Sequence, residues 1–232
     1  MFQYRPVFCT FFPVLLCMVF FRLAAQEVLR GEVQIDIEAV HGGYVDTIYP
    51  LDTESVYRRA LEESALFYAA MIYGWSFEYD VGEKSRGISE VFDLTPLGEI
   101  PFGDPGLFAT DTEVENMRFH LWTDYRLTTE QQRRMSLWKT GTVRTAQAVG
   151  HGPLGDPIEE TDWITIKKAA LEDAARLAVR TMLRGSERNR PKEVRGYISL
   201  SSFPNYWIDS GQWAASARFR IEITEIIPFA AY

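Results

Sequence analysis

The chain has 232 residues, 47% of them hydrophobic, and a formal net charge of −8 from 32 acidic and 24 basic residues. This length is enough for one large domain or two small ones with a real hydrophobic core. Nucleic acid and anionic lipid surfaces require positive charge on their partners, so we expect this acidic chain to bind neither.

Residues 1–25 have the layout of a secretory signal peptide. Arg5 precedes the apolar run Val7–Phe21, and the small pair Ala24-Ala25 follows it, so we predict cleavage after Ala25. A retained membrane anchor is the alternative, but the run is short for a bilayer and Pro13 interrupts it. We therefore expect an exported protein of the periplasm or cell envelope, without a stable membrane span after cleavage.

Both cysteines, Cys9 and Cys17, lie in this leader. An exported chain without cysteine has no disulfides, no thiolate metal site and no cysteine nucleophile. An acylated Cys17 would instead make a lipoprotein, although Leu15-Leu16 lack the small residue that such sites have. The leader carries two arginines and no acid, so the mature charge is 22 − 32 = −10.

The first half of the mature chain alternates between strand and helix patterns. A period of two predicts half-buried strands, and Asp52 can cap a helix that runs to Tyr73. The proline- and glycine-rich segment Pro96–Thr112 predicts a long ordered loop. The predicted strands are Glu32–Val40, Trp75–Val81, Ile88–Leu94 and Val114–Thr128.

The second half of the predicted first helix, Leu66–Tyr73 (LFYAAMIY), has no charged side. Such a segment must be buried around most of its circumference. We expect it in the core; burial against a partner is the alternative.

The second half of the chain contains the clearest helix, Trp163–Gly185, with a cap at Thr161 or Asp162. A helical turn at Thr129–Arg134 and an extended segment, Met135–Val149, are expected before it. Two or three strands are expected after it, at Val194–Ser202, roughly Tyr206–Trp213, and Ala215–Ile227, with a hairpin turn at Asp209-Ser210-Gly211.

Three pairs of segments repeat at similar spacings. Ala39–Gly43 resembles Ala148–Gly152, Arg58–Ala65 resembles Lys168–Ala175, and Arg118–Leu121 resembles Arg218–Ile221. The alternative is two unrelated helices that share a common A-L-E-x-x-A pattern.

The repeat predicts an α+β fold of two pseudo-repeated units, each a strand, a helix and an antiparallel meander. Each helix packs on a mainly antiparallel sheet. The units span residues 26–134 and 135–232, as two domains or one continuous domain.

The helix motifs at Ala60–Ala65 and Ala170–Ala175, with the strands around them, resemble the small α+β module of envelope lipoproteins. They are also similar to the N-terminal domain of FlgT-type flagellar ring accessory proteins. The resemblance implies an assembly or scaffolding role with envelope or flagellar proteins as partners, and no catalytic residues. The chain departs from the module by carrying it twice and by its long loop.

The sequence contains no motif for catalysis, cofactor binding or metal binding. The histidines His41, His120 and His151 lack paired-ligand spacing, and no G-x-S-x-G elbow or phosphate-binding loop occurs. We therefore expect a protein that is not an enzyme and has no cofactor and no metal.

Two functions are compatible with the absence of these motifs. The sequence predicts neither the oligomeric state nor the identity of a partner. The first is a structural or assembly role through protein–protein contacts. The alternative is a small-molecule or glycan-binding module, with a pocket formed by the Pro96–Thr112 loop and nearby aromatic residues. The residues proposed for an interaction surface are apolar or aromatic: Phe67, Met71, Tyr206, Trp207 and Trp213.

Overall fold

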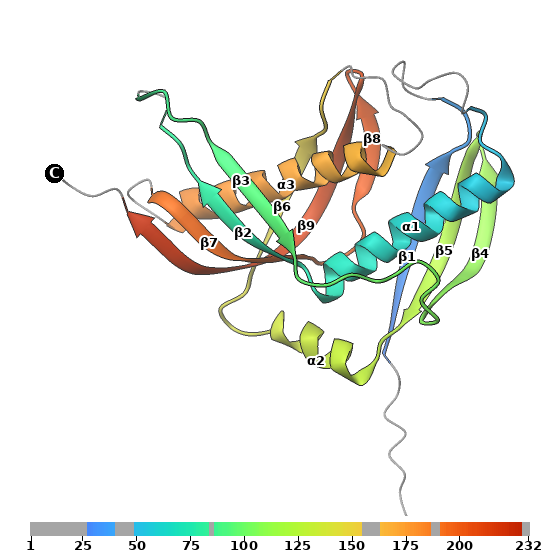
Figure 1. Cartoon of the computed structure of the whole chain (residues 1–232), viewed down its shortest axis with the longest axis horizontal. Helices are drawn as coiled ribbons and strands as arrows, with labels where there is room; N and C mark the ends of the chain where they lie inside the picture. The colour runs from blue at the N-terminus through green and yellow to red at the C-terminus, as the bar shows by residue number, and fades with distance from the viewer. Residues whose placement is uncertain (1–26, 40–48, 84–85, 155–162, 187–190, 229–232) are drawn as a thin grey trace, which may run out of the picture.

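A computed structural model describes residues 27–39, 49–83, 86–154, 163–186 and 191–228. In these ranges the chain forms helices and antiparallel sheets (Figure 1), so the predicted α+β class is confirmed. The predicted leader, His41 and the predicted cap at Thr161 or Asp162 lie outside the described residues.

The first sheet has three strands and one covering helix. Strands β1 (Val28–Asp36), β5 (Arg118–Arg126) and β4 (Leu107–Glu115) lie in the order β1-β5-β4, all antiparallel. Helix α1 (Thr53–Ile72) crosses this sheet diagonally (Figure 1). Side-chain packing of α1 on β1 and β5 forms the core of this half.

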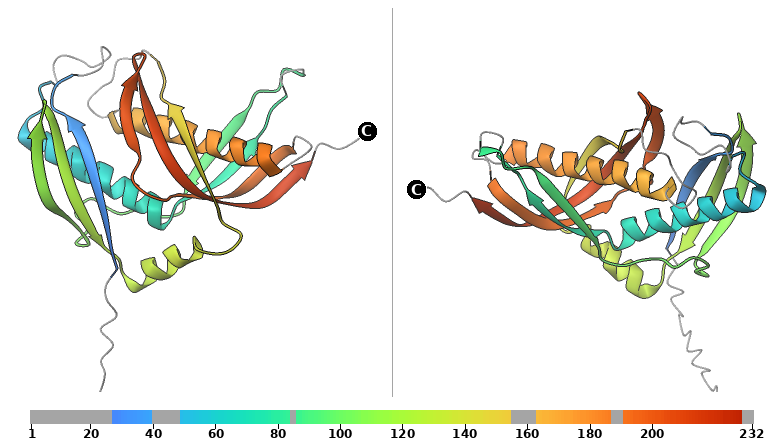
Figure 2. Two further views of the ribbon diagram at one scale, coloured as in Figure 1. Left: turned by 180° about the vertical axis from the view of Figure 1, so that it is seen from behind. Right: turned by 45° about the horizontal axis from the view of Figure 1, so that its top comes forward.

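The second sheet has six strands in the order β3-β2-β7-β9-β6, and β8 pairs with β9. Helix α3 (Trp163–Ser186) lies along its concave face, against β6 and β9 (Figure 2). The strands are β2 (Trp75–Asp80), β3 (Val91–Pro96), β6 (Arg144–His151), β7 (Pro191–Leu200), β8 (Asn205–Asp209) and β9 (Gln212–Pro228).

Close approach of α3 to the second sheet depends on small residues. Ala170, Ala174 and Ala178 are fully buried on the helix face that meets β6 and β9. On β6, a Cβ at Gly150 would lie 2.0 Å from the backbone nitrogen of Ala174, so only glycine fits there.

The uncharged half of α1 is buried in the core, as predicted. Asp52 caps the helix by accepting a hydrogen bond from the Ser55 backbone nitrogen at 2.7 Å. All the residues between Phe67 and Ile72 belong to the core cluster. Helix α2 (Thr129–Leu137) closes the far end, where Trp138 Nε1 donates to the Ile72 carbonyl at 3.0 Å.

Two predicted elements around the first sheet were wrong. The single strand Val114–Thr128 is a hairpin, because Asn116 and Met117 take positive φ angles of 51° and 59° and reverse the chain. The last third of the predicted loop Pro96–Thr112 belongs to β4, and its first residue, Pro96, ends β3. Only the part between these two strands is a loop.

Other predicted bounds are shifted. The first strand begins earlier than Glu32, at Val28, and the third covers Val91–Pro96. Helix α2 begins where the turn was predicted, with a capping box that joins Thr128 and Gln131, and it continues to Leu137, so β6 begins only at Arg144. The hairpin turn after Asp209 is confirmed, but it ends the predicted strand Tyr206–Trp213 early, so that Trp213 belongs to β9.

The two halves share one connection pattern. In the first, β1 is followed by α1 and pairs with β5, the last strand of its half; in the second, β6 is followed by α3 and pairs with β9. The hairpin of β2 and β3 departs from the pattern, because β2 pairs with β7 of the other half. Hydrogen bonds therefore join the predicted units 26–134 and 135–232.

Candidate functional site

A pocket of about 410 Å³ lies between α1 and α3 and is called here the interhelical pocket. Its volume falls in the range of pockets that hold small molecules. Strands β2 and β3 and Phe219 of β9 also contribute to its lining. Its helix-borne lining residues are Glu62, Ala65, Leu66, Ala69 and Ala70 from α1, and Ile164, Lys168, Leu171, Glu172 and Ala175 from α3.

The hollow exists because the facing positions on the two helices are small. Ala65 and Ala69 of α1 and Ala175 of α3 line the gap with methyl groups only. A pair of larger residues at these positions would close the space, as happens in close-packed protein interiors. Alanine at these positions therefore leaves an apolar hollow that larger side chains would have filled as part of the hydrophobic core.

The segment between β3 and β4 lines another side of the interhelical pocket. Pro96, Ile100 and Phe102 contribute to the lining, and Phe102 is 62% exposed. Gly98 allows the segment to lie against the end of α1, because a Cβ there would be 2.6 Å from the Tyr73 ring. This is the first part of the loop predicted from the sequence to form a ligand pocket.

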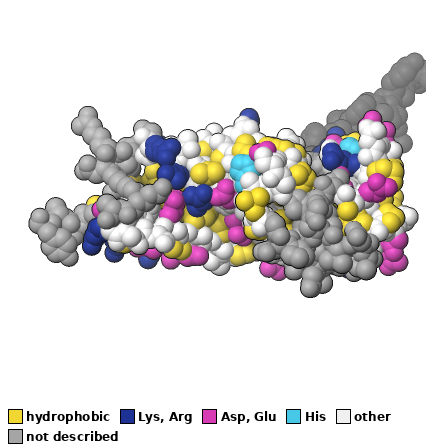
Figure 3. Space-filling view, turned by 90° about the horizontal axis from the view of Figure 1, so that it is seen from above, with side chains coloured by type: hydrophobic (Ala, Val, Ile, Leu, Met, Phe, Trp, Pro, Cys, Tyr) yellow, Lys and Arg dark blue, Asp and Glu magenta, His cyan; other side chains and the backbone are white. Residues whose placement is uncertain are grey.

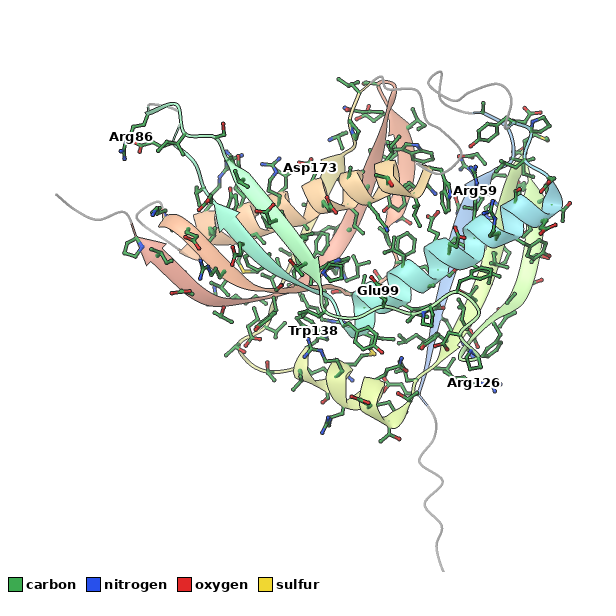
Figure 4. The ribbon with its side chains drawn as sticks, viewed as in Figure 1. Arg59, Arg86, Glu99, Arg126, Trp138 and Asp173 are labelled. Carbon is green, nitrogen blue, oxygen red and sulfur yellow. The ribbon has the colours of Figure 1, made fainter. Side chains whose placement is uncertain are left out.

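Charged residues at the interhelical pocket are mainly acidic. Glu62, Glu99 and Glu172 lie along it with a single cation, Lys168. Burial raises the pKa of Glu172, and the charge of Lys168 only partly opposes this. Figure 4 labels Glu99 on the segment that passes α1.

A buried ion pair joins α1 to α3 and lines a second hollow. Lys167 of α3 donates from Nζ to both carboxylate oxygens of Glu63 of α1, at 3.0 and 2.7 Å. The side chains are 7% and 3% exposed. Burial raises the pKa of Glu63, while the charge and hydrogen bonds of Lys167 oppose the shift. The adjacent Glu62 and Lys168 line the interhelical pocket, because neighbouring helical residues point about 100° apart.

Aromatic rings surround the ammonium group of Lys167. Its Nζ lies 5.0 Å from the ring centroid of Trp213, 5.2 Å from Tyr206 and 5.9 Å from Trp163. Desolvated cation–π contacts of this kind contribute about 2 kcal/mol. The hydroxyl of Tyr206 also donates to the Lys167 carbonyl at 3.1 Å.

The second hollow, of about 470 Å³, is called the charged cleft. It lies between β1 and the segment that joins β7 to β8. Its lining residues are Arg30, Glu32, Val33, Gln34, Asp36, Glu63, Phe67, Arg118, Lys167, Ser202, Phe203, Pro204, Asn205, Tyr206 and Trp213. From above, basic and acidic side chains are interspersed with hydrophobic ones on the visible face (Figure 3).

The five residues proposed from the sequence for an interaction surface do not form one exposed surface. Phe67, Met71 and Trp213 are buried, at 2%, 7% and 6% exposure. Tyr206 is partly buried against the core, and Trp207 alone of the five is exposed. Phe67, Tyr206 and Trp213 nevertheless meet in the lining of the charged cleft.

The two histidines in the described ranges lie apart on different strands. His120 of β5 pairs with Glu32 at 2.8 Å, and His151 of β6 lies 3.3 Å from Asp209. Within the described residues, no three histidine, cysteine or acidic side chains are grouped as metal ligands. Over the same ranges, no helix has the length and apolar character needed to cross a membrane.

Sequence reasoning missed the residues that build the two hollows. Helical periodicity places Arg59, Glu63 and Lys167 among the charged residues of two amphipathic helices. Their burial follows from the meeting of α1 and α3, which are 104 residues apart at the ion pair. The sign available in the sequence is the position of Lys167, four residues after Trp163 and three before Ala170, which places it on the same helix face as these two residues.

A protein-family model matches residues 19–229 of the chain. A protein from Treponema pallidum (strain Nichols), described as an uncharacterized protein, is 25% identical over 171 residues, which cover 74% of this chain and 69% of that protein. No solved structure matches the chain.

Proposed function

We propose that this chain, which belongs to the family whose model matches residues 19–229, is an exported non-enzymatic protein that binds a small apolar molecule in the interhelical pocket. The observation that carries the proposal is the hollow of about 410 Å³ between α1 and α3, lined by alanine where core residues would otherwise pack. This is the binding-module alternative of the sequence analysis.

The chemistry of the interhelical pocket selects the ligand class. Alanine, leucine and isoleucine side chains favour an apolar body, since apolar burial contributes about 25 cal/mol per Å². Three carboxylates against one lysine at the pocket favour a positively charged group on that body. The proposed ligand is therefore an apolar molecule with an amine or another cation.

A pocket-filling variant tests the proposal. Ala69→Trp places an indole in the interhelical pocket, and Ala169→Trp places the same group on α3 outside it. Displacement of the fluorescent probe N-phenyl-1-naphthylamine by dodecylamine is measured in both variants, after circular dichroism confirms folding. We expect wild type and Ala169→Trp to bind and Ala69→Trp to lose binding at least ten-fold. Equal binding by both variants contradicts the proposal.

Export is part of the proposal and is supported by the composition of residues 1–25. Its test is the N-terminal sequence of the protein isolated from its cells. A mature chain that begins at Gln26 supports export with cleavage, and a chain that retains Met1 in the cytoplasm contradicts it.

The assembly role, with envelope or flagellar partners, has one structural observation in its favour. Strand β4 lies at the edge of its sheet and exposes Val114 at 60%. The acids Asp111, Glu113 and Glu115 along the same strand oppose addition of another strand, as charged edges do in natural sheets. Crosslinking in the native envelope tests it, and recovery of monomer alone counts against a scaffold.

We also infer that the two halves arose by duplication. The matched helix segments Arg58–Ala65 and Lys168–Ala175 are 110 residues apart in the sequence. The matched Phe119 and Phe219 pair with Ile35 and Ala146, which are 111 residues apart. Agreement between helix spacing and strand register supports a common origin. A superposition of residues 28–126 on 144–221 that misplaces the helices by a turn contradicts it.

A further inference from the structure

Arg59 of α1 is 2% exposed and lacks a full set of hydrogen-bond partners. Its Nη1 donates to the Tyr49 hydroxyl at 3.3 Å. Its Nε and Nη2 have no hydrogen-bond partner among the described residues. A buried charged donor without a partner is costly, so this arrangement calls for an explanation.

The neighbouring charges are already paired. Glu63 binds Lys167 with both oxygens, and Asp36 binds Arg118 at 2.8 Å. At the open end of the charged cleft, Arg30 pairs with Asp124 and Glu32 with His120. Among the described residues of this region, Arg59 is the charge without an ionic partner.

The unpartnered nitrogens lie on one edge of the guanidinium group. Nε and Nη2 donate in parallel directions, and this pair matches the two oxygens of a carboxylate. The guanidinium group also contacts two aromatic rings, with its Cζ 5.2 Å from the Trp163 ring centroid and 5.9 Å from that of Tyr49. Arg59 is thus oriented before any ligand arrives.

A small chamber of about 20 Å³ lies beside Arg59. It is lined also by Ile35, Asp36, Tyr49, Trp163, Lys167 and Trp213. Asp36, Lys167 and Trp213 line the charged cleft as well, so the chamber adjoins that larger hollow. The chamber has room for a water molecule, and Asp36, Arg59 and Lys167 contribute charged groups to its lining.

We propose that Arg59 binds the carboxylate group of a small organic acid, whose body lies in the charged cleft. The Nε and Nη2 edge donates two parallel hydrogen bonds to the carboxylate, and Trp163 and Tyr49 contact the guanidinium group. Lys167 and Asp36 also line the chamber, and each is already bound to a partner of opposite charge, Glu63 and Arg118 respectively. The aromatic residues Phe67, Phe203 and Trp213 suit a body with an apolar or ring portion. This site is separate from the interhelical pocket.

The experiment measures thermal stabilisation of the full mature chain by benzoate, with sodium chloride at equal ionic strength and benzylamine as controls. Binding to the folded state raises the melting temperature in proportion to ln(1 + [L]/Kd). We expect a saturable rise with benzoate alone. Arg59→Met should weaken benzoate binding at least ten-fold, since charge-assisted bidentate pairs are the strong ones. The exposed neighbour Arg58 provides the matched control, Arg58→Met, which should bind as wild type does.

A second measurement keeps the test decisive if Arg59→Met does not fold. In wild type, the Arg59 Nε–H resonance should shift and saturate with benzoate. The pocket variant Ala69→Trp should keep the benzoate response, which separates this site from the proposed apolar site. Equal stabilisation by chloride shows an adventitious ion only and overturns the proposal. So does a benzoate response that survives in Arg59→Met, or no response in wild type.

Discussion

The buried ion pair between Glu63 and Lys167 allows a quantitative prediction for Lys167→Met. Both side chains are almost fully buried, and Lys167 Nζ binds both carboxylate oxygens. Methionine has a side chain of similar length to lysine but no positive charge. The Glu63 carboxylate therefore stays buried without a counter-charge. Removing one partner of such a pair costs about 3–5 kcal/mol. For a chain of this size the melting temperature should fall by about 6–20 °C.

The loss of stability in Lys167→Met should depend on pH, because protonation makes the Glu63 carboxyl group neutral. Burial raises the pKa of Glu63, and loss of Lys167 raises it further. A carboxyl whose folded pKa lies above its unfolded value of 4.5 destabilises the fold fully above the folded pKa. This cost disappears as the pH falls toward the unfolded value. The deficit of Lys167→Met should therefore be largest near neutral pH and shrink toward about pH 5.

Urea unfolding followed by tryptophan fluorescence is a suitable assay, because Trp163 and Trp213 surround Lys167. The exposed neighbour supplies the control, Lys168→Met, which should change stability by about 0.5 kcal/mol or less. The double variant Glu63→Leu/Lys167→Met should recover most of the loss, since it buries no lone charge. A loss below about 1 kcal/mol in the single variant, unchanged with pH, would refute this reasoning.

Two further predictions concern other contacts. Gly150→Ala should cost about 3 kcal/mol, at the upper end for overpacking, because its Cβ would lie 2.0 Å from a backbone nitrogen of α3. Gly141→Ala has open space and should be near neutral in the same urea assay; equal effects contradict the packing argument. Burial alone would raise the pKa of Glu90, but hydrogen bonds from Tyr79 and Arg176 lower it overall. Glu90 therefore stabilises the fold above its unfolded pKa, and this is lost as pH falls through the folded pKa. The deficit of Glu90→Gln should be present at neutral pH and vanish in acid, and a pH-independent deficit argues against the shift.

Local patterns in the sequence predicted the elements whose causes are local. The cap at Asp52, the uncharged half of α1 and the turn after Asp209 depend on residues within a few positions of each other. The turn at Asn116-Met117 escaped prediction because methionine rarely takes a positive φ, so the hairpin looked like one strand. The position of that turn is determined by the pairing of β4 with β5 in the folded chain.

The candidate site was predictable in one part only. The loop after Pro96 was expected to line a ligand pocket, and its first residues do line one. The ion pair and the chamber beside Arg59 depend on α1 and α3 meeting across a long stretch of chain. Periodicity places Glu63 and Lys167 each on a helix, but it does not say which faces of two distant helices meet.

The two helices use matched positions differently, which bears on how the hollows arose. On the proposed alignment, Glu63 of α1 corresponds to Asp173 of α3. Asp173 accepts a hydrogen bond from the His151 backbone nitrogen of its own half at 3.0 Å and pairs with Arg176. Glu63 instead reaches across to Lys167. Asp173 thus connects α3 to β6, a strand of its own sheet, whereas Glu63 connects α1 to α3. The ion pair holds α1 and α3 together at one place, and alanine residues next to it leave space between the two helices. Glu63 and Lys167 line the charged cleft, while the adjacent Glu62 and Lys168 line the interhelical pocket, so both hollows depend on the place where α1 and α3 meet.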